Sequence, residues 1–212
     1  MLRTAFLACL VALAGYVSAS WLTHDFEVWT AEGARRLEVA QQPVPVPPVS
    51  IDGWGIAAQR LPTLLAQGGG ITLVDFVYTR CQTVCLSLGS SFQQFQAALQ
   101  ADRAAGKSPM VHLLSISFDG AYDSPAVLQA YASKLDADPT VWNWVRVPDT
   151  AEQQKLMQRL GVMVIPNGVG DYEHNAAFLV FDAQGRMVRV FDLGEQQLAL
   201  DYARHLAKGG RL

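Results

Sequence analysis

Two cysteines, Cys81 and Cys85, are the side chains of this sequence whose type and spacing best suit redox chemistry or metal binding. They follow residues 71–78, a run of β-branched and aromatic side chains typical of a buried strand, and they stand where a helix is expected to begin. A spacing of four places both sulfurs on one helical face, with Cα atoms roughly 6 Å apart. That distance permits a disulfide bond or two thiolate ligands to one metal ion, and the helix N-terminus favours the thiolate in either case.

The alternative interpretation of this pair is a purely structural disulfide. A ring this short adds only roughly 2 kcal/mol by restricting the unfolded chain. The third cysteine, Cys9, lies in an apolar N-terminal segment, so the rest of the chain has no further cysteine for a disulfide framework. We therefore expect the pair to be redox-active, metal-binding or both.

Strands alternate with helices on both sides of the cysteine pair. Strands are expected over residues 71–78, 110–117, 141–147, 177–182 and 187–191, and helices over about 84–101, 124–135, 150–160 and 195–207. This order predicts an α/β, thioredoxin-like fold, in which helices flank a central mixed sheet with a parallel core and a closing hairpin. Ligands of such sheets bind beyond the carboxyl ends of the strands, which is where Cys81 lies.

A third ligand for a metal ion is available from His174. It precedes the expected strand 177–182, whose entry faces the cysteine loop in a thioredoxin-like sheet. Thiolates favour Cu(I), and imidazole is acceptable to both copper states. Structural zinc normally takes four protein ligands, and the sequence has no evident fourth. Two cysteines and one histidine therefore favour copper.

The N-terminus is expected to target the protein to a membrane. Residues 1–22 hold Arg3 and then an uninterrupted apolar run, which fits a signal peptide or a membrane anchor, and the length of the run favours the anchor. Residues 23–50 are expected to be a tether, because four prolines fall within 43–48, and a short strand is expected over 35–40. Residues 51–208 then form one folded domain. The net charge of −3 and the lack of a basic stripe speak against a nucleic-acid partner.

The segments around these residues resemble the Sco/SenC family of copper-binding, thioredoxin-like proteins that assemble cytochrome c oxidase. The resemblance lies in residues 75–85 with their CxxxC motif, in 170–174 ahead of 178–182, and in 115–119 and 123–125. It covers roughly residues 53–205. A CxxxC motif combined with a distant histidine before a strand is a specific pattern.

The resemblance implies a thioredoxin-like domain in the bacterial periplasm, anchored to the inner membrane or exported by a cleaved signal peptide. It implies that Cys81, Cys85 and His174 bind one copper ion per monomer, as Cu(I) or Cu(II). The expected partner is the copper subunit of cytochrome c oxidase, whose dinuclear centre would receive the copper, or another copper-site protein. Asp119 and Asp123 match acidic positions near the family's site and are expected to orient a partner or support the ligands. Alternatively, Asp123 merely belongs to the turn before the helix at 124–135.

Three residues depart from the family pattern. Gln82 and Leu86 stand where the family usually has a proline after each cysteine, so the loop keeps an extra N–H and a less rigid turn. Asp75 stands where the family commonly has an apolar residue and is similar to the buried acid that assists proton transfer in thioredoxin. A buried carboxylate has a raised pKa; the alternative is a strand-edge acid with a local hydrogen-bond partner.

A second function therefore stays open for the same two sulfurs. The protein would be a thiol–disulfide oxidoreductase outside the cytoplasm that uses Cys81 and Cys85, and it would reduce the cysteines of a copper-site partner. Asp75 would then assist proton transfer. We do not expect a classical enzyme, and the two functions are compatible, because copper binding requires the reduced pair.

Overall fold

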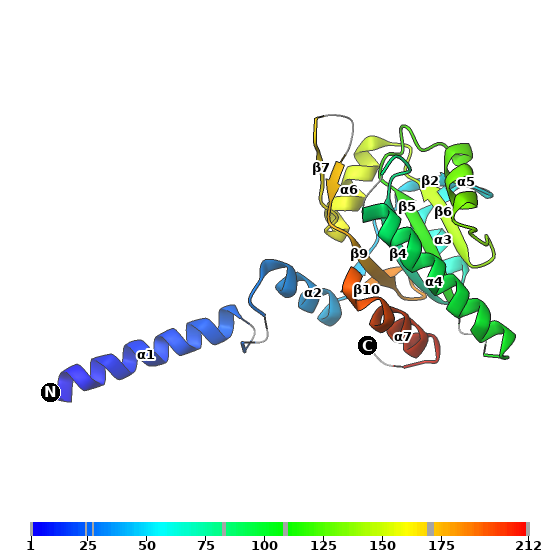
Figure 1. Cartoon of the computed structure of the whole chain (residues 1–212). Helices are drawn as coiled ribbons and strands as arrows, with labels where there is room; N and C mark the ends of the chain where they lie inside the picture. The colour runs from blue at the N-terminus through cyan, green and yellow to red at the C-terminus, as the bar shows by residue number, and fades with distance from the viewer. Residues whose placement is uncertain are drawn as a thin grey trace. The chain divides into compact units, whose positions relative to one another are not determined.

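The chain folds as two compact units, Met1–Gln42 and Pro43–Leu212 (Figure 1). A computed structural model describes residues 2–23, 25–26, 28–81, 84–107, 110–168 and 172–210, without the side chains of Val84 and Leu86. The first unit begins with helix α1, Leu2–Leu22, which is long and apolar enough to cross a membrane. A signal sequence has the same length and composition, so α1 fits either form of targeting segment.

The second helix of this unit, α2, spans Ala31–Gln41. The strand expected over residues 35–40 was therefore wrong. Thr30 caps the helix by accepting a hydrogen bond from the Gly33 N–H at 3.0 Å. Glu32 then pairs with Arg35 at 2.6 Å and with Arg36 at 2.9 Å, one helical turn further on. These local contacts explain why the segment is helical.

An eight-stranded mixed sheet forms the centre of the second unit, in the order β1-β10-β9-β4-β5-β6-β2-β3. Its strands are β1 (Val44–Pro45), β2 (Ser50–Gly53), β3 (Ile56–Arg60), β4 (Ile71–Val77), β5 (Val111–Ser117), β6 (Trp142–Arg146), β9 (Ala177–Phe181) and β10 (Arg186–Asp192). Strands β4, β5 and β6 are parallel, and the other pairs are antiparallel. The expected α/β architecture with a mixed central sheet is thus confirmed.

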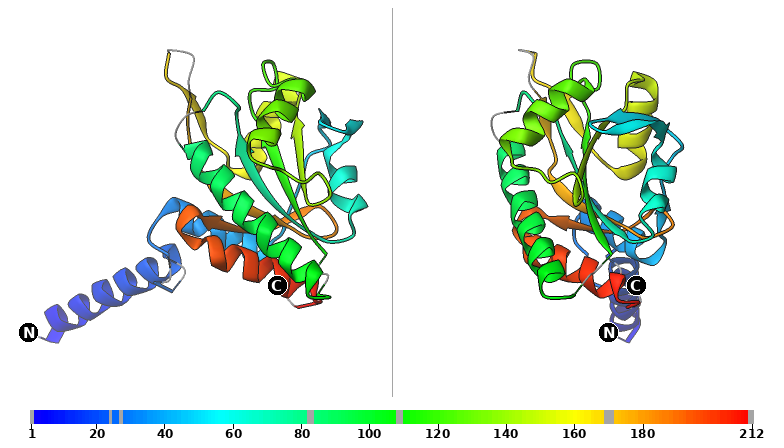
Figure 2. Two further views of the ribbon diagram at one scale, coloured as in Figure 1. Left: turned by 45° about the vertical axis from the view of Figure 1, so that its right-hand side comes forward. Right: turned by 90° about the vertical axis from the view of Figure 1, so that its right-hand side faces the viewer.

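Helices cover both faces of this sheet (Figure 2). The helices are α3 (Leu61–Gln67), α4 (Val84–Ala104), α5 (Pro125–Lys134), α6 (Thr150–Leu160) and α7 (Gln196–Ala207). Helices α4, α5 and α7 lie on one face, where Arg204 of α7 pairs with Asp102 of α4 at 2.7 Å. Helices α3 and α6 lie on the other face.

The proline-rich residues 43–50 belong to the second unit. Strand β1 pairs with β10, and the side chains of Val46 and Val49 are buried. The backbone N–H of Ser50 donates to the Glu152 carboxylate of α6 at 2.6 Å. The compact unit therefore begins eight residues before the expected domain start at 51.

A separate two-stranded sheet stands beside the carboxyl end of β4. It consists of β7 (Val164–Pro166) and β8 (Tyr172–His174), which pair antiparallel with Val164 opposite His174. His174 was expected in a loop. It is instead the last residue of β8, where the backbone ladder fixes its direction.

Candidate metal centre

Cys81 and Cys85 are held where β4 passes into α4. The backbone N–H of Cys81 donates to the Tyr78 carbonyl at 3.2 Å, and Cys85 lies in the first turn of α4. Both side chains are buried and reduced. The backbone N–H of Cys85 donates to the Cys81 sulfur at 3.4 Å. This contact, at a helix N-terminus, favours the thiolate form of Cys81.

The side chain of His174 approaches the cysteine pair from β8. Its Nε2 lies 3.4 Å from the Cys85 sulfur, and its Nδ1 lies 3.2 Å from the backbone carbonyl of Asn175. A carbonyl only accepts, so the ring proton sits on Nδ1 and the Nε2 lone pair faces Cys85. Burial lowers the pKa of His174, which keeps the ring neutral and able to ligate.

The ligand atoms of these three residues lie within 4.8 Å of one another. Within the described part of the chain, no other group of three histidine, cysteine or acidic side chains gathers closely enough to hold an ion. Two sulfurs and one imidazole nitrogen form a soft donor set, which suits Cu(I) and tolerates Cu(II). The structure therefore brings together the three residues that the sequence singled out as ligands.

The two thiols are electrostatically unequal. Burial raises the pKa of the Cys85 thiol strongly, and the neighbouring Cys81 and the charges of Asp75 and Asp123 raise it further. Cys85 is therefore protonated in the metal-free site, with its S–H directed at His174 Nε2. A metal ion held by both atoms would take the place of this proton.

An aromatic cluster surrounds His174. The ring of Phe118 lies edge-on to the imidazole at a centroid distance of 5.0 Å, and that of Tyr78 at 6.2 Å. Tyr172 closes the cluster by packing on Tyr78 at 5.2 Å. These rings pack around the imidazole and support its orientation. Sequence reasoning missed this role, although all three residues lie within the segments that carry the family resemblance.

Asp123 and Asp119 anchor the cysteine loop. Asp123 is fully buried, and its carboxylate accepts hydrogen bonds from the Thr79 N–H at 3.1 Å, the Thr79 hydroxyl at 2.5 Å and the Ser117 hydroxyl at 2.6 Å. Asp119 pairs with Arg80 at 2.6 Å. Both acids thus tie the segment after β5 to the residues just before Cys81, so Asp123 does more than complete a turn.

Asp75 lies in the middle of the sheet, in β4 between β9 and β5, and is fully buried. The alternative of a strand-edge acid is therefore wrong. Neither carboxylate oxygen has a hydrogen-bond partner among the described residues. Burial raises the pKa of Asp75 to about 7, and the nearby Ser115 hydroxyl offsets only part of the shift.

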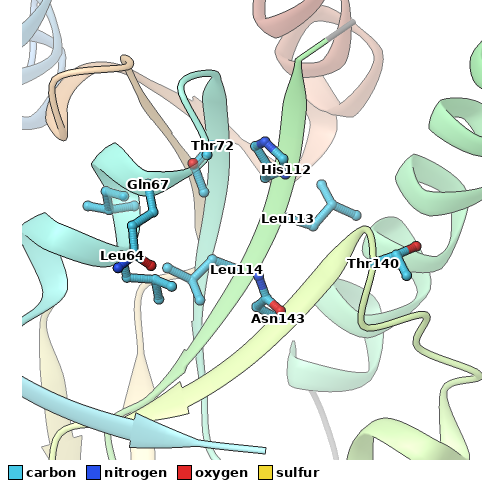
Figure 3. A pocket seen from close by; sticks show the side chains of 10 residues that line it. Leu64, Gln67, Thr72, His112, Leu113, Leu114, Thr140 and Asn143 are labelled. Atoms are coloured by element: carbon cyan, nitrogen blue, oxygen red, sulfur yellow. The ribbon is translucent and has the colours of Figure 1, made fainter. Parts of the chain in front are cut away.

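The other described histidines lie elsewhere. His112, near the start of β5, lines a cavity of about 300 Å³ together with Gln67, Thr72 and Asn143 (Figure 3). Because β4 and β5 are parallel, this cavity lies at the end of the sheet opposite the cysteines.

Of the positions that depart from the family pattern, Gln82 lies outside the described residues, and so does the side chain of Leu86.

Comparison with known proteins identifies relatives of this chain. The family model SCO1/SenC matches residues 66–207. A SCO1 protein homolog of Bacillus subtilis is 21% identical over 126 residues, which cover 58% of this chain and 63% of that relative. The chain therefore spans less than two thirds of the length of this curated relative.

Two solved structures extend the comparison. Bradyrhizobium japonicum ScoI with copper bound is 26% identical, with a TM-score of 0.59 over 75% of this chain and 99% of the other. BsSco, described as a member of the Sco family of cytochrome c oxidase assembly proteins with a disulfide switch, is 18% identical, with a TM-score of 0.66 over 79% and 95% of the two chains. The second likeness supports the thioredoxin-like fold alone.

Proposed function

The chain belongs to the SCO1/SenC family, and from this premise we propose that it binds one copper ion through Cys81, Cys85 and His174. The copper is cargo for a partner with a copper site, and the partner that fits the family is the copper subunit of cytochrome c oxidase. The observation that carries the proposal is the approach of three soft ligand atoms to within 4.8 Å of one another. A relative of this chain is also known with copper bound.

The reduced, metal-free site is prepared for the ion. His174 Nε2 carries a lone pair because Nδ1–H is held by the Asn175 carbonyl, and Cys81 is favoured as a thiolate by the Cys85 N–H. Only the Cys85 proton has to leave. Copper binding therefore releases a proton, and the apparent affinity increases with pH.

Replacing His174 with alanine is expected to weaken Cu(II) binding by at least 10-fold while leaving the fold intact. One of three ligands is lost, and Cu(II) depends on the imidazole more than Cu(I) does. The measurement is an anaerobic copper titration of the reduced full chain, followed by absorption and metal analysis. The matched control is His205→Ala, which removes an exposed histidine of α7. Equal Cu(II) affinity in His174→Ala and His205→Ala would exclude His174 as a ligand.

We also propose thiol–disulfide exchange as a second function of the same pair. The observation that favours it is the inequality of the two thiols: Cys81 accepts the helix N–H and suits the attacking role, whereas the buried, protonated Cys85 suits the resolving role. The reaction would reduce a disulfide in a copper-site partner. It also prepares that partner, because copper ligation needs reduced cysteines.

Location outside the cytoplasm is a further part of the proposal. Helix α1 would anchor the protein or serve as its signal peptide, with Arg3 on the cytoplasmic side, and residues 23–42 would link it to the copper domain. Deleting residues 1–22 is expected to move the protein from the membrane fraction to the soluble cytoplasmic fraction. Cell fractionation of the full and shortened chains measures this; retention of the shortened chain in the membrane would count against the anchor.

A further inference from the structure

Tyr78 contacts both parts of the candidate metal centre. It directly follows β4, and its side chain is buried. Its main-chain carbonyl accepts a hydrogen bond from the Cys81 N–H at 3.2 Å. Its hydroxyl oxygen lies 3.4 Å from the main-chain nitrogen of Tyr172 and 3.4 Å from the carbonyl oxygen of the same residue, 94 positions further along the chain. One residue therefore joins the cysteine loop to β8, the strand that ends with His174.

The Tyr78 hydroxyl contacts β8 through the main-chain groups that an additional strand would use. A hydroxyl can accept a hydrogen bond from an N–H and donate one to a carbonyl at the same time. The residue opposite Tyr172 in β7 is Pro166, which has no N–H to donate. The Tyr78 hydroxyl thus supplies the Tyr172 carbonyl with a donor that Pro166 cannot provide. Distances of 3.4 Å are long for a hydroxyl, so each bond is weak and both depend on where the ring lies.

Neighbouring rings hold the Tyr78 ring in place. The ring of Phe118 packs on it at a centroid distance of 5.1 Å, and the ring of Tyr172 stands edge-on to it at 5.2 Å. A phenylalanine at position 78 would keep these ring contacts, and it would keep the carbonyl that accepts the Cys81 N–H. The substitution Tyr78→Phe therefore removes the hydroxyl alone.

The small sheet that carries His174 needs an attachment of this kind. Strands β7 and β8 have three residues each and form a sheet of their own. A two-stranded sheet is marginally stable by itself. The Asn175 side chain ties β8 to the chain before β7, whereas Tyr78 ties it to the side of the cysteines. Because the His174 Nε2 lies only 3.4 Å from the Cys85 sulfur, a shift of β8 moves the imidazole relative to both thiols.

We propose that the Tyr78 hydroxyl determines which oxidation states of copper the site retains, because it keeps His174 within bonding distance of the ion held by the cysteines. This inference rests on the copper-binding part of the proposed function. Two soft thiolates select Cu(I), so the cysteine pair holds that ion without the imidazole. Cu(II) prefers nitrogen and oxygen ligands in a tetragonal arrangement and depends on the imidazole. Tyr78 is thus a positioning residue, which acts on the ion through β8.

The experiment compares Tyr78→Phe with the control Tyr172→Phe. The control removes a hydroxyl from the same aromatic cluster but keeps the Tyr172 N–H and carbonyl that Tyr78 contacts. All proteins are reduced full chains in detergent that carry Cys9→Ala, so that the exposed third thiol binds no copper. Hydrogen exchange of the metal-free proteins, followed by mass spectrometry, is expected to be about 10-fold faster in the β8 peptides of Tyr78→Phe and unchanged in the control. Peptides from β5 report whether the fold is intact.

Anaerobic titrations with Cu(I) and with Cu(II) then give the affinity of each protein for each ion. Tyr78→Phe is expected to weaken Cu(II) binding about 10-fold and to leave Cu(I) binding within about twofold of wild type. Its Cu(II) absorption and electron paramagnetic resonance spectra are expected to change, because the imidazole no longer holds its place. Tyr172→Phe is expected to match the wild type for both ions and in its spectra.

Equal Cu(II) affinity in Tyr78→Phe and in the wild type or the control overturns the inference, even if the exchange of β8 accelerates, since the hydroxyl would then support the fold alone. Unchanged exchange of β8 in Tyr78→Phe overturns it as well. An equal loss of Cu(I) and Cu(II) affinity does the same, because the preference between the two ions would be unaltered. A wild-type chain that binds neither ion contradicts the proposed function itself, and the exchange of β8 still decides whether Tyr78 holds the strand.

Discussion

Asp75→Asn is expected to flatten the pH dependence of stability between pH 4 and pH 7. In the folded chain burial raises the pKa of Asp75 from 3.8 to about 7, so across this range the folded state keeps a proton that the unfolded state has lost. Wild-type stability contributed by this group is therefore greatest below pH 4 and falls as the pH rises toward 7. The difference amounts to at most about 4 kcal/mol.

The measurement is the free energy of unfolding in urea at several pH values, for the wild type and Asp75→Asn. His112 and His174 have pKa values lowered from 6.5 by burial, so they act in the opposite direction and stabilise the fold increasingly as the pH rises toward 6.5. These histidines are common to both proteins, and the difference between the two curves isolates Asp75. Parallel curves would mean that the carboxyl group is not buried as described.

Asp123→Ala is expected to reduce the free energy of unfolding by about 3 kcal/mol and to weaken copper binding at least 10-fold. The carboxylate holds three hydrogen bonds at a fully buried position, and its removal leaves the Thr79 N–H and two hydroxyl groups without their acceptor. The segment that leads to Cys81 then loses one tie to the residues at and after the end of β5 and keeps another, the Arg80–Asp119 pair. Urea unfolding and copper titration measure the two effects.

The control for this prediction is Ser117→Ala. It removes one of the three hydrogen bonds of Asp123 but leaves both contacts with Thr79 in place. We expect a loss of about 1 kcal/mol in stability and little change in copper affinity. If Ser117→Ala weakens copper binding as much as Asp123→Ala does, the effect belongs to the packing around β5 and not to the anchor on Thr79.

Regular periodicity made most of the fold predictable. The strands and helices after residue 70 lie close to their expected positions, because apolar runs alternate with amphipathic segments there. Among the elements that went unpredicted, α2 is held by local contacts, whereas β1 and β8 are short and depend on distant partners. Strand β1 is two residues long and forms by pairing with β10, and β8 forms by pairing with β7.

The three residues of the candidate metal centre could be singled out because cysteine and histidine are rare in this chain, whereas the groups that surround them could not. Asp75 illustrates the difference. A single acid in an apolar run is compatible with an edge strand or a central strand, and only the strand order places β4 between β9 and β5. The contacts of Asp123 with Thr79 join residues 44 positions apart, a separation at which local patterns carry no information.

The hydrogen bond that orients His174 does not depend on the amino-acid type of its partner residue. Its acceptor is the main-chain carbonyl of Asn175, an atom that every amino acid supplies. No single substitution at position 175 removes that carbonyl. The acceptor that holds the ring proton on Nδ1 and leaves Nε2 free to bind is therefore insensitive to the residue type at this position. The side chain of Asn175, by contrast, accepts a hydrogen bond from the Met163 N–H and donates one to the Gly161 carbonyl. A substitution at this position would remove both of these hydrogen bonds. A substitution at position 175 can therefore alter how the β7–β8 sheet is attached without removing the acceptor that directs the imidazole lone pair.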